Sequence, residues 1–481
     1  MGTARGSPTG RDTVFEATGV AAGFGRRSVR SCATVRRKPL SPPQLLALHL
    51  AGLIAAGTLL LSLPFAAAPG RHISVLDALF TSTSAVCVTG LIVVDTPKDF
   101  SLAGQIVILV LIQAGGLGYM TISTLIAVAL GRRVTLQERL TLQEALNIYT
   151  REGLLRFAAS VFKFTLVLEL AGAAILTARW APEFGLGRAA YAGLFHAVSA
   201  FNNAGFALFS DNLMRFRGDL TVNLVVTTLI ICGGLGFLVL SEVARLQRRV
   251  TLSVHAKFVL AMTAILIAAG TLAIFALERG NPRSLGPLGA GEALLASYFQ
   301  AVTPRTAGFN TLDIGALTAP TLFLIILLMF IGASPGSTGG GIKTTTFGIT
   351  MAALWSTVTG RNEPVVFGRR LAPDLIAKAF FISLIAFLAV NLISWLVLFA
   401  ERRDFLSTVF ETTSAFGTVG LSMPPAGAVF SLSGTFSAAG KLLEAAMMYL
   451  GRVGPLTLAV ALAGRAARVR LRYPEAKVLI G

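Results

Sequence analysis

The chain has 481 residues, of which 54% are hydrophobic and 13% are charged. Because soluble globular proteins carry about a quarter charged residues, this composition excludes an ordinary soluble protein and indicates one that lies in a membrane. The formal net charge is +18, which in a membrane protein reflects topology and attraction to anionic lipid rather than binding to nucleic acid.

The first segment, residues 1–41, differs in composition from the rest of the chain. Its first 40 residues carry eight basic side chains, with Asp12 and Glu16 against them. We assign this segment no fold and predict a basic, disordered arm on the cytoplasmic side. A transit peptide, which is also rich in Arg and Ser and poor in acidic residues, is the alternative.

Long apolar runs dominate the remainder. Residues 45–64, 221–240 and 379–400 contain no Asp, Glu, Lys or Arg, and about 20 apolar residues are enough to cross the hydrocarbon core as a helix. One such run could be a buried helix of a soluble protein. Eight of them in one chain predict a protein that crosses the membrane several times.

Four segments of this chain resemble one another when they are aligned without gaps: residues 79–91, 194–206, 297–309 and 409–421. They share one glycine, at Gly90, Gly205, Gly308 and Gly420. Ten residues before each glycine stands an aromatic residue, which is Phe80, Phe195, Tyr298 or Phe410. The glycines are 115, 103 and 112 residues apart. This period is too long for a solenoid and suits a unit of two membrane helices with a re-entrant segment between them.

Each unit predicts an outer helix, a short apolar helix of about a dozen residues that cannot span, a loop and a second helix. Non-helical backbone at membrane depth is tolerated only inside protein or beside a wet cavity. We therefore predict an all-α polytopic membrane protein with four pseudo-fourfold repeats of helix, pore loop and helix, which place eight spanning helices and four re-entrant pore helices around a central pore. The repeats are residues 42–131, 132–245, 246–360 and 361–481, the last with a C-terminal cytoplasmic tail. The outer helices are expected near 45–64, 157–178, 256–277 and 379–400, the first short helix near 75–86, and the second helices near 103–130, 220–243, 320–350 and 438–463.

The distribution of basic residues predicts the orientation. Of the 41 Lys and Arg residues, 12 lie on the pore-loop side and 28 lie in the segments 1–44, 131–163, 245–257, 343–378 and 465–481. Cytoplasmic loops carry the excess of Lys and Arg. Both termini are therefore expected in the cytoplasm, with the four pore loops near the outer face.

The four shared glycines point to a cation filter. A dehydrated K+ needs oxygen ligands, and rings of backbone carbonyl groups supply them without burying a formal charge. Glycine adopts the unusual dihedral angles of such a backbone without steric cost, and the C-terminal end of each short helix favours a cation. A single glycine would more simply mark a turn, but four in register after four short helices favour the filter.

Two features lie outside the filter. The stretch GASPGSTGGG, which begins at Gly332, holds five glycines and one proline in ten residues and cannot remain a regular helix. It predicts either a plain kink or a movable plug beneath the filter; Lys343, just past it, could bind lipid, contact a partner or latch the loop.

Arg452 is an intramembrane charge and so a functional candidate. It would repel cations if it faced the pore, whereas an ion pair with Glu444 would make it structural.

These motifs resemble a known family. The segments CVTGL, NNAGF, RTAGF and GTVGL are similar to the four filters of the Trk/Ktr/HKT superfamily of K+ transporters. Residues 332–343, GASPGSTGGGIK, resemble its gating loop, and residues 450–457, LGRVGPLT, resemble the helix whose arginine faces the pore. The eight spans and LIQAGGLGYMT at 111–121 favour the Ktr-type membrane subunit. The resemblance extends from about Pro42 to the last helix.

The resemblance implies a K+ uptake protein rather than an enzyme. It further implies a homodimer in the lipid of the plasma (inner) membrane, bound to a cytoplasmic nucleotide-binding regulatory ring of the RCK type. K+ would be the transported ion, and Na+ an optional second ion through Na+ dependence or symport. No organic cofactor is implied. The implied K+ filter, which would bind K+ by backbone carbonyls, is Val88, Thr89, Gly90, Asn203, Ala204, Gly205, Thr306, Ala307, Gly308, Thr418, Val419 and Gly420. The implied gating loop contains Gly332, Ser334, Pro335, Gly336, Ser337, Thr338, Gly339, Gly340, Gly341 and Lys343, and the implied pore arginine is Arg452.

The filter departs from fourfold symmetry at Cys87, Asn202, Asn203 and Arg305. We expect the side chain of Arg305 to point away from the axis, toward an acidic residue such as Asp313 or Glu411. The first repeat keeps Gly90, whereas in the plant relatives a serine at this position goes with Na+ preference. The resemblance therefore favours K+ as the transported ion.

Two other functions compete with this interpretation. A K+-translocating subunit of an ATP-driven pump shares the pore-loop plan, although the sequence has no Walker motif, so a partner would have to supply the energy. An intramembrane enzyme needs a nucleophile, base or metal cluster. The four histidines are scattered without an HExxH setting, and the three cysteines lack paired spacing, so neither disulfide nor zinc chemistry is indicated.

Overall fold

The computed structural model describes residues 42–118, 154–245, 251–361, 363–425 and 427–455, together with residue 457. The contacts divide the chain into a unit of residues 1–39 and a unit of residues 40–481. The predicted basic arm, residues 1–41, lies outside the described residues. So do the predicted continuation of the 103–130 helix past residue 118 and the predicted C-terminal tail.

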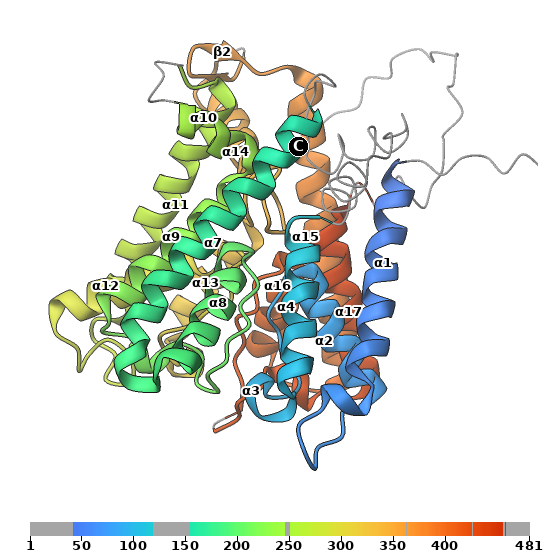
Figure 1. Cartoon of the computed structure of the whole chain (residues 1–481). Helices are drawn as coiled ribbons and strands as arrows, with labels where there is room; N and C mark the ends of the chain where they lie inside the picture. The colour runs from blue at the N-terminus through green and yellow to red at the C-terminus, as the bar shows by residue number, and fades with distance from the viewer. Residues whose placement is uncertain are drawn as a thin grey trace, which may run out of the picture. The chain divides into compact units, whose positions relative to one another are not determined.

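Within the larger unit almost every element is a helix, and the elements follow one order four times: a long helix, a short buried helix, a short turn and a further helix (Figure 1). The first group is α1 (Pro42–Leu61), η1 (Pro64–Ala66), α2 (Val75–Cys87), α3 (Thr96–Asp99) and α4 (Leu102–Gly116). The second group is α7 (Leu154–Phe184), α8 (Leu186–Phe201), η2 (Met214–Phe216), α9 (Leu220–Leu235) and α10 (Phe237–Arg245). The third group is α11 (Val254–Glu278), α12 (Ala290–Val302), η4 (Ile314–Ala316), α13 (Ala319–Phe330) and α14 (Thr344–Val358). The fourth group is α15 (Pro373–Glu401), α16 (Phe405–Gly417), η5 (Leu432–Thr435) and α17 (Ala438–Val453), and an antiparallel hairpin of β1 (Val365–Val366) and β2 (Arg369–Arg370) precedes it.

The long helices match the predicted outer helices. In the described part, four helices are long and apolar enough to cross a membrane by length and composition: Gln44–Leu61, Phe157–Phe184, Val254–Glu278 and Pro373–Glu401. Large apolar side chains on α15 are exposed to the surroundings, among them Trp395 at 62% and Phe399 at 77%. Apolar side chains that face outward from an apolar helix are suited to contact with lipid.

The further helix of each group is not the unbroken helix that the sequence predicts. The predicted helix 220–243 is broken at Gly236, where α9 and α10 meet at an angle of 106°. The predicted helix 320–350 is interrupted between α13 and α14, at the glycine-rich stretch. The two remaining helices, α4 and α17, end at Gly116 and Val453. Because a uniformly apolar run does not reveal a change of backbone direction, hydropathy alone missed the points at which these helices end or break.

Caps fix the ends of the short helices. The Ser74 hydroxyl accepts a hydrogen bond from the Asp77 amide at the start of α2, and Asp404 caps α16 in the same way. Such caps satisfy amide groups that have no partner within the helix. Both helices end on a residue in the left-handed conformation, Val88 after α2 and Thr418 after α16. The helices therefore end where the predicted filter begins.

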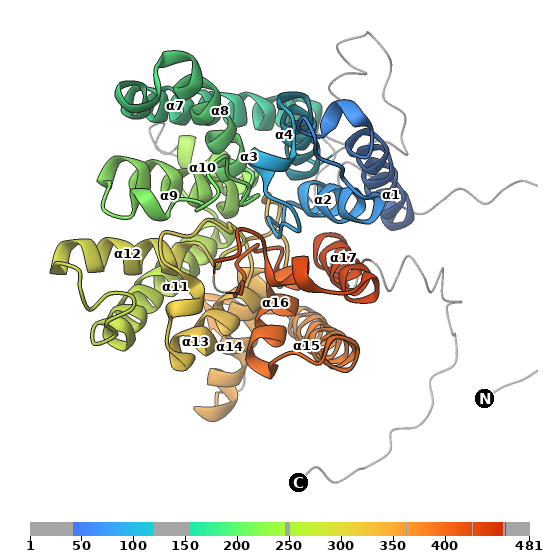
Figure 2. The ribbon, with the colours of Figure 1, turned by 90° about the horizontal axis from the view of Figure 1, so that it is seen from below.

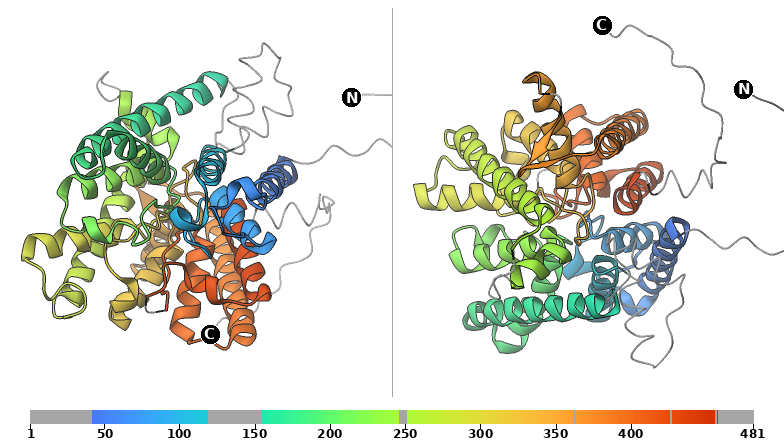
Figure 3. Two further views of the ribbon diagram at one scale, coloured as in Figure 1. Left: turned by 60° about the horizontal axis from the view of Figure 1, so that its bottom comes forward. Right: turned by 90° about the horizontal axis from the view of Figure 1, so that it is seen from above.

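The four groups are arranged in a circle. The further helix of each group packs against the short helix of the next: α4 against α8, α9 against α12, α13 against α16, and α17 against α2. Figure 2 shows the four groups around a centre into which the loops converge, and Figure 3 shows the same order from other directions. The last contact joins the fourth group to the first, and it includes an ion pair of 2.7 Å between Lys441 of α17 and Asp77 of α2.

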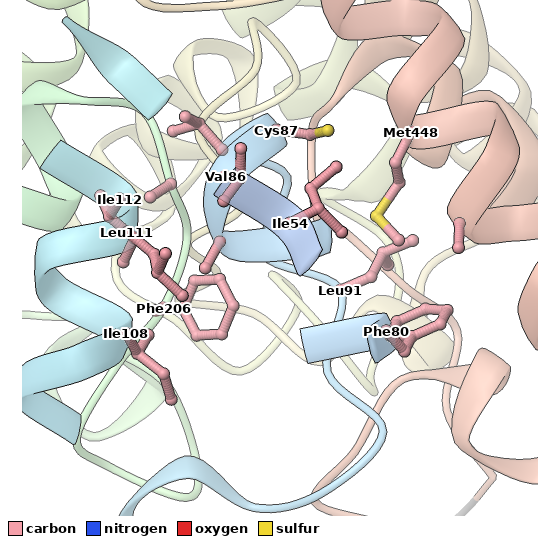
Figure 4. Close-up of a cluster of buried hydrophobic side chains, with 14 of the residues drawn as sticks. Ile54, Phe80, Val86, Cys87, Leu91, Ile108, Leu111, Ile112, Phe206 and Met448 are labelled. Carbon is pink, nitrogen blue, oxygen red and sulfur yellow. The ribbon is translucent and has the colours of Figure 1, made fainter. Parts of the chain in front are cut away.

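The largest buried apolar cluster lies at this closing contact. Figure 4 shows Val86 and Cys87 of α2 between Ile112 of α4 and Met448 of α17. Phe80 belongs to the same cluster and is almost completely buried. Side chains of this kind each contribute about 1.5–3 kcal/mol when they are fully buried. The short helix α2 is thus held on both sides, which fixes the loop that follows it.

Candidate functional site

Each short helix is followed by a loop with one backbone pattern; we call these four segments, residues 88–90, 203–205, 306–308 and 418–420, the filter loops. In every filter loop the first residue and the final glycine have positive φ angles. These angles are 58° at Val88, 60° at Asn203, 71° at Thr306, 48° at Thr418, 91° at Gly90, 70° at Gly205, 75° at Gly308 and 93° at Gly420. A positive φ is uncommon for residues other than glycine and costs about 1–3 kcal/mol. Such strain persists only where the surroundings impose it. Its repetition at four places indicates that all four loops hold this backbone conformation for the same purpose.

The four glycines form a closed ring. A Cβ atom added to any one of them would lie closer than 3.0 Å to a carbonyl oxygen of the next filter loop. The contacts run from Gly90 to Ala204, from Gly205 to Ala307, from Gly308 to Val419 and from Gly420 to Thr89. A side chain therefore fits at none of these positions. The carbonyl groups of four different loops are brought to one place at the centre of the circle.

All twelve predicted filter residues lie in this ring. Eleven of them are buried and Gly420 is partly exposed. The described residues contain no group of three or more His, Cys, Asp or Glu side chains suited to hold a metal ion. The backbone carbonyl oxygens that the packing of the four glycines brings to the centre are uncharged ligands suited to a hard monovalent cation.

A serine supports the first and fourth filter loops in the same way. The Gly90 amide donates to Ser84 Oγ and the Gly420 amide donates to Ser414 Oγ, each at 3.0 Å. The amide one residue earlier, of Thr89 or Val419, donates to the carbonyl of the same serine at 2.8 Å. The amide groups of both loops thus bond back to their own short helix.

The second and third filter loops use a hydroxyl differently. Ser199 Oγ donates to the Phe206 carbonyl at 2.8 Å, and Thr303 Oγ1 donates to the Phe309 carbonyl at 2.5 Å. In the third group α12 already ends at Val302, before the filter loop 306–308 begins. Phe299 is fully buried there, as Phe80, Phe195 and Phe410 are in the other groups. The alignment without gaps, which placed Tyr298 at this position, is wrong by one residue.

The predicted gating loop, residues 332–343, which we call the glycine-rich loop, lies against the filter loops. The Gly340 amide donates to Thr418 Oγ1 at 3.0 Å. Thr338 Oγ1 donates to the Phe201 carbonyl at 3.3 Å, and a Cβ on Gly339 would meet the side chain of Thr306. The loop therefore contacts three of the four groups at the level of the filter loops.

The glycine-rich loop is closed on itself. The Gly332 amide donates to the Ile342 carbonyl at 2.8 Å, and Lys343 Nζ donates to the Gly339 carbonyl at 2.7 Å. Ser334 Oγ and Thr344 Oγ1 share a hydrogen bond of 2.9 Å. The Lys343 ammonium group thus bonds to the loop that precedes it. The other predicted members, Pro335, Gly336, Ser337 and Gly341, lie in the same non-helical segment.

The break between α9 and α10 docks on the glycine-rich loop. The amides of Ser334 and Thr338 donate to the carbonyls of Gly234 at 3.0 Å and Gly233 at 3.2 Å. The Phe237 amide donates back to the Gly336 carbonyl at 2.9 Å. The second group thus supplies backbone partners for a loop of the third group, a contact that the sequence did not predict.

Arg452 joins the fourth group to this assembly. Its guanidinium group donates to the carbonyls of Thr338, Gly115 and Gly116. The expected alternative, an ion pair with Glu444, is wrong: Glu444 instead accepts a hydrogen bond of 2.8 Å from Thr412. Arg452 therefore connects the glycine-rich loop to the end of α4, with neutral carbonyl groups as its partners.

One signal in the sequence could have identified these breaks. The tetrapeptide GGLG occurs at residues 115–118 and 233–236, and GRVG stands at 451–454. The first glycine of each packs on the carbonyl of Val86, Phe201 or Phe416, which lies four residues before a filter glycine. Arg452 thus occupies the place of the second glycine. These short motifs mark the points at which α4, α9 and α17 end.

The expectation for Arg305 is partly wrong. Its side chain is 4% exposed and donates to Thr263 Oγ1 of α11 at 3.2 Å. Asp313 is exposed and caps η4. Glu411 accepts hydrogen bonds from Ser422 and Ser433. The partner of Arg305 is thus a neutral hydroxyl on the outer helix of its own group, not one of the expected acids.

Residues 53–467 match the family TrkH, described as a cation transport protein. The chain is 45% identical to Ktr system potassium uptake protein B of Bacillus subtilis over 92% of this chain and 97% of that protein. It is 40% identical to the protein of the same name from Vibrio alginolyticus, over 91% and 95% of the two chains. Potassium/sodium uptake protein NtpJ of Enterococcus hirae is 37% identical, over 92% and 98%.

A solved structure has the same fold. The crystal structure of the potassium transporter TrkH from Vibrio parahaemolyticus superposes with a TM-score of 0.71 at 20% identity, and covers 89% of this chain and 86% of that one. The mostly helical architecture with apolar helices is therefore that of a multi-pass membrane protein. The relatives are named as uptake proteins, which confirms the expectation that the chain is not an enzyme, and the family resemblance expected from the motifs is confirmed.

Proposed function

Because the chain belongs to the TrkH family of cation transport proteins, we propose that it takes up K+ through a central pore surrounded by four pseudo-fourfold repeats. Residues 42–131, 132–245, 246–360 and 361–481 would be the repeats, each with two spanning helices and a re-entrant pore helix. The proposal is supported by the closing contacts of the circle, in which each further helix packs on the next short helix.

The observation that carries the proposal is the closed ring of four glycines. Carbonyl oxygens of four loops converge where no side chain fits. Such oxygens can replace the hydration shell of K+ without a formal negative charge. The C-terminal ends of α2, α8, α12 and α16 all lead into this ring, and their partial negative charge favours a cation. The twelve residues of the filter loops would thus form the selectivity filter.

A gate beneath this filter is the second part of the proposal. The glycine-rich loop blocks the approach to the filter loops through its contacts with Thr418, Phe201 and Thr306. Arg452 places a positive charge beside it and holds it through the Thr338 carbonyl. A cation that passed would meet this charge in a medium of low dielectric. Displacement of the loop and of Arg452 together would open the path.

The remaining proposals concern assembly. The names of the B. subtilis and V. alginolyticus relatives place them in a Ktr system, and one relative is named for both potassium and sodium. We therefore propose a homodimer in the plasma (inner) membrane, a cytoplasmic nucleotide-binding regulatory ring of the RCK type as partner, and Na+ as an activating or cotransported ion. The excess of Lys and Arg in the segments opposite the pore loops supports termini in the cytoplasm.

Flux measurements test the function. Proteoliposomes that contain the full chain should take up K+ in preference to Na+, with and without the cytoplasmic partner. In a Gly90→Ser variant the added side chain would collide with the Ala204 carbonyl. We expect K+ over Na+ selectivity to fall at least about tenfold, or about 1.4 kcal/mol between the two ions. Selectivity that stays at the wild-type value would contradict the assignment of the filter.

A further inference from the structure

The middle of one outer helix carries an acidic residue that the function described so far does not use. Glu169 lies in α7, within the apolar span Phe157–Phe184, and its side chain is turned inward so that the residue is 4% exposed. A carboxyl group at such a place is costly to bury. Intramembrane acids of this kind almost always face the protein interior and are candidates for a functional role.

Two amide side chains hold the Glu169 carboxylate. Gln113 Nε2 of α4 donates to Oε2 at 3.2 Å, and Asn202 Nδ2, at the end of α8, donates to Oε1 at 3.0 Å. Asn202 also donates to Gln113 Oε1 at 2.7 Å. Both oxygens of the Glu169 carboxyl group thus accept hydrogen bonds from neutral amide groups. Among the described residues no basic side chain forms an ion pair with Glu169.

These contacts reach the arginine beneath the filter. Asn202 Oδ1 is buried and presses against Gly116, where an added Cβ would collide with it. The Gly116 carbonyl accepts a hydrogen bond of 3.3 Å from Arg452, and the adjacent Gly115 carbonyl also accepts from Arg452. Three consecutive contacts therefore connect the carboxylate of Glu169 to the guanidinium of Arg452. Asn202 is also the residue before Asn203, the first residue of the second filter loop.

The charges on the two ends of this path are complementary. Arg452 and Lys343 put two positive charges next to the glycine-rich loop, and both donate to neutral carbonyl groups. No acidic partner of either is found within ion-pair distance in the part of the chain that the structure describes. In a medium of low dielectric a negative charge a few contacts away still lowers the potential at the pore.

We propose that Glu169 is a positioning residue for transport, which orients Asn202 and the end of α4 and offsets the positive charge of Arg452 beneath the filter. The inference rests on the proposed function, since it assigns Arg452 to the ion path. Without the charge of Glu169, the barrier that Arg452 presents to a cation rises. When a neutral residue replaces Arg452, the positive charge that Glu169 offsets is gone, so loss of the Glu169 charge should have little further effect.

A double-mutant cycle tests this inference in the full chain. We expect Glu169→Gln to lower K+ uptake by proteoliposomes about fivefold or more in the wild-type background, which is the range of couplings between interacting sites. In an Arg452→Gln background the same change should lower uptake by less than about twofold. Glu169→Asp, which keeps the charge, should retain most of the wild-type uptake. An equal loss from Glu169→Gln in both backgrounds, or no loss in either, overturns the proposal.

A buried carboxylate away from this path provides the control. Glu278, at the end of α11, accepts from the Thr318 amide at 2.8 Å and from its hydroxyl at 2.7 Å, and so holds the residue before α13. Glu278→Gln should affect uptake equally with and without Arg452. The same double-mutant cycle can also be measured by the midpoint of thermal unfolding in detergent, which does not depend on transport. If wild-type protein carries no K+, the proposed function fails, whereas additive shifts of the midpoint for Glu169→Gln and Arg452→Gln would overturn the present inference.

Discussion

The ring of filter loops and the glycine-rich loop beneath it meet at Thr418, and both contain many glycines. In the ring, each glycine faces a carbonyl oxygen of the neighbouring group, and the four contacts repeat around the circle. In the glycine-rich loop, the partners all differ: Thr418 from the fourth group, the α9 carbonyls from the second, and Lys343 and Arg452 as charged donors. The first arrangement fixes a backbone from four sides, whereas the second holds a loop by separate bonds that can be broken one by one.

The comparison shows that the role of a glycine depends on what surrounds its Cα rather than on glycine content. A ring glycine is required because there is no room for a Cβ atom. In the glycine-rich loop Gly339 and Gly340 also have no room for a Cβ atom. There it would first meet the side chains of Thr306 and Thr418 rather than carbonyl groups. Gly336 has a positive φ of 65° within a segment that no helix or strand continues, and glycine adopts this conformation without strain. The following predictions test whether the ring is rigid and whether the glycine-rich loop can be released.

The largest effect is expected in the ring, from Gly308→Ala. The new Cβ would meet the Val419 carbonyl and approach the Cα atoms of Gly205 and Gly420, at a residue whose φ is 75°. Left-handed strain and overpacking together cost about 2–5 kcal/mol. We expect K+ uptake to be lost or the folded protein to fall below detection, as measured by flux and by size-exclusion chromatography in detergent.

A matched glycine provides the control for this prediction. Gly280, in the turn after α11, has no atom within 4 Å of the position that a Cβ would take. Gly280→Ala should leave flux and expression at the wild-type level. If Gly308→Ala behaves like Gly280→Ala, the ring is not rigid and the contrast between the two regions fails.

The second effect is expected in the loop, and it has the opposite sign. Arg452→Ala removes the hydrogen bonds to Thr338, Gly115 and Gly116, together with the positive charge. Hydrogen bonds to charged groups contribute about 1.5–3 kcal/mol, so we expect K+ flux without the cytoplasmic partner to rise roughly 10- to 100-fold. Arg283→Ala, at an exposed arginine, is the control. Flux and regulation that both match the wild type would remove Arg452 from the mechanism.

The sequence predicted most of the ring and little of what supports the loop. Lipid requires long apolar helices, so the predicted span 379–400 lies within α15, and each of the four shared glycines follows a short helix, as the sequence predicts. The break at Gly236 was missed because the residues on both sides are equally apolar. The partner of Arg305 was missed because Thr263 is uncharged and 42 residues away. Contacts to backbone carbonyls, such as those of Arg452, leave no trace in side-chain patterns.

The smallest effect is expected from the serine hydroxyl that accepts from the glycine amide in the first and fourth filter loops but not in the other two. Ser414→Ala removes the acceptor of the Gly420 amide and leaves the rest of α16 in place. A hydrogen bond of this kind contributes about 1 kcal/mol, so K+ over Na+ selectivity should fall about fivefold while total cation flux changes little. Ser407→Ala, in the first turn of α16 where the hydroxyl donates to the Asp404 carbonyl at 3.0 Å, should leave selectivity unchanged. Equal effects of the two changes would mean that selectivity does not depend on the Gly420 amide, and that the rigidity of the ring comes from the carbonyl contacts between neighbouring groups.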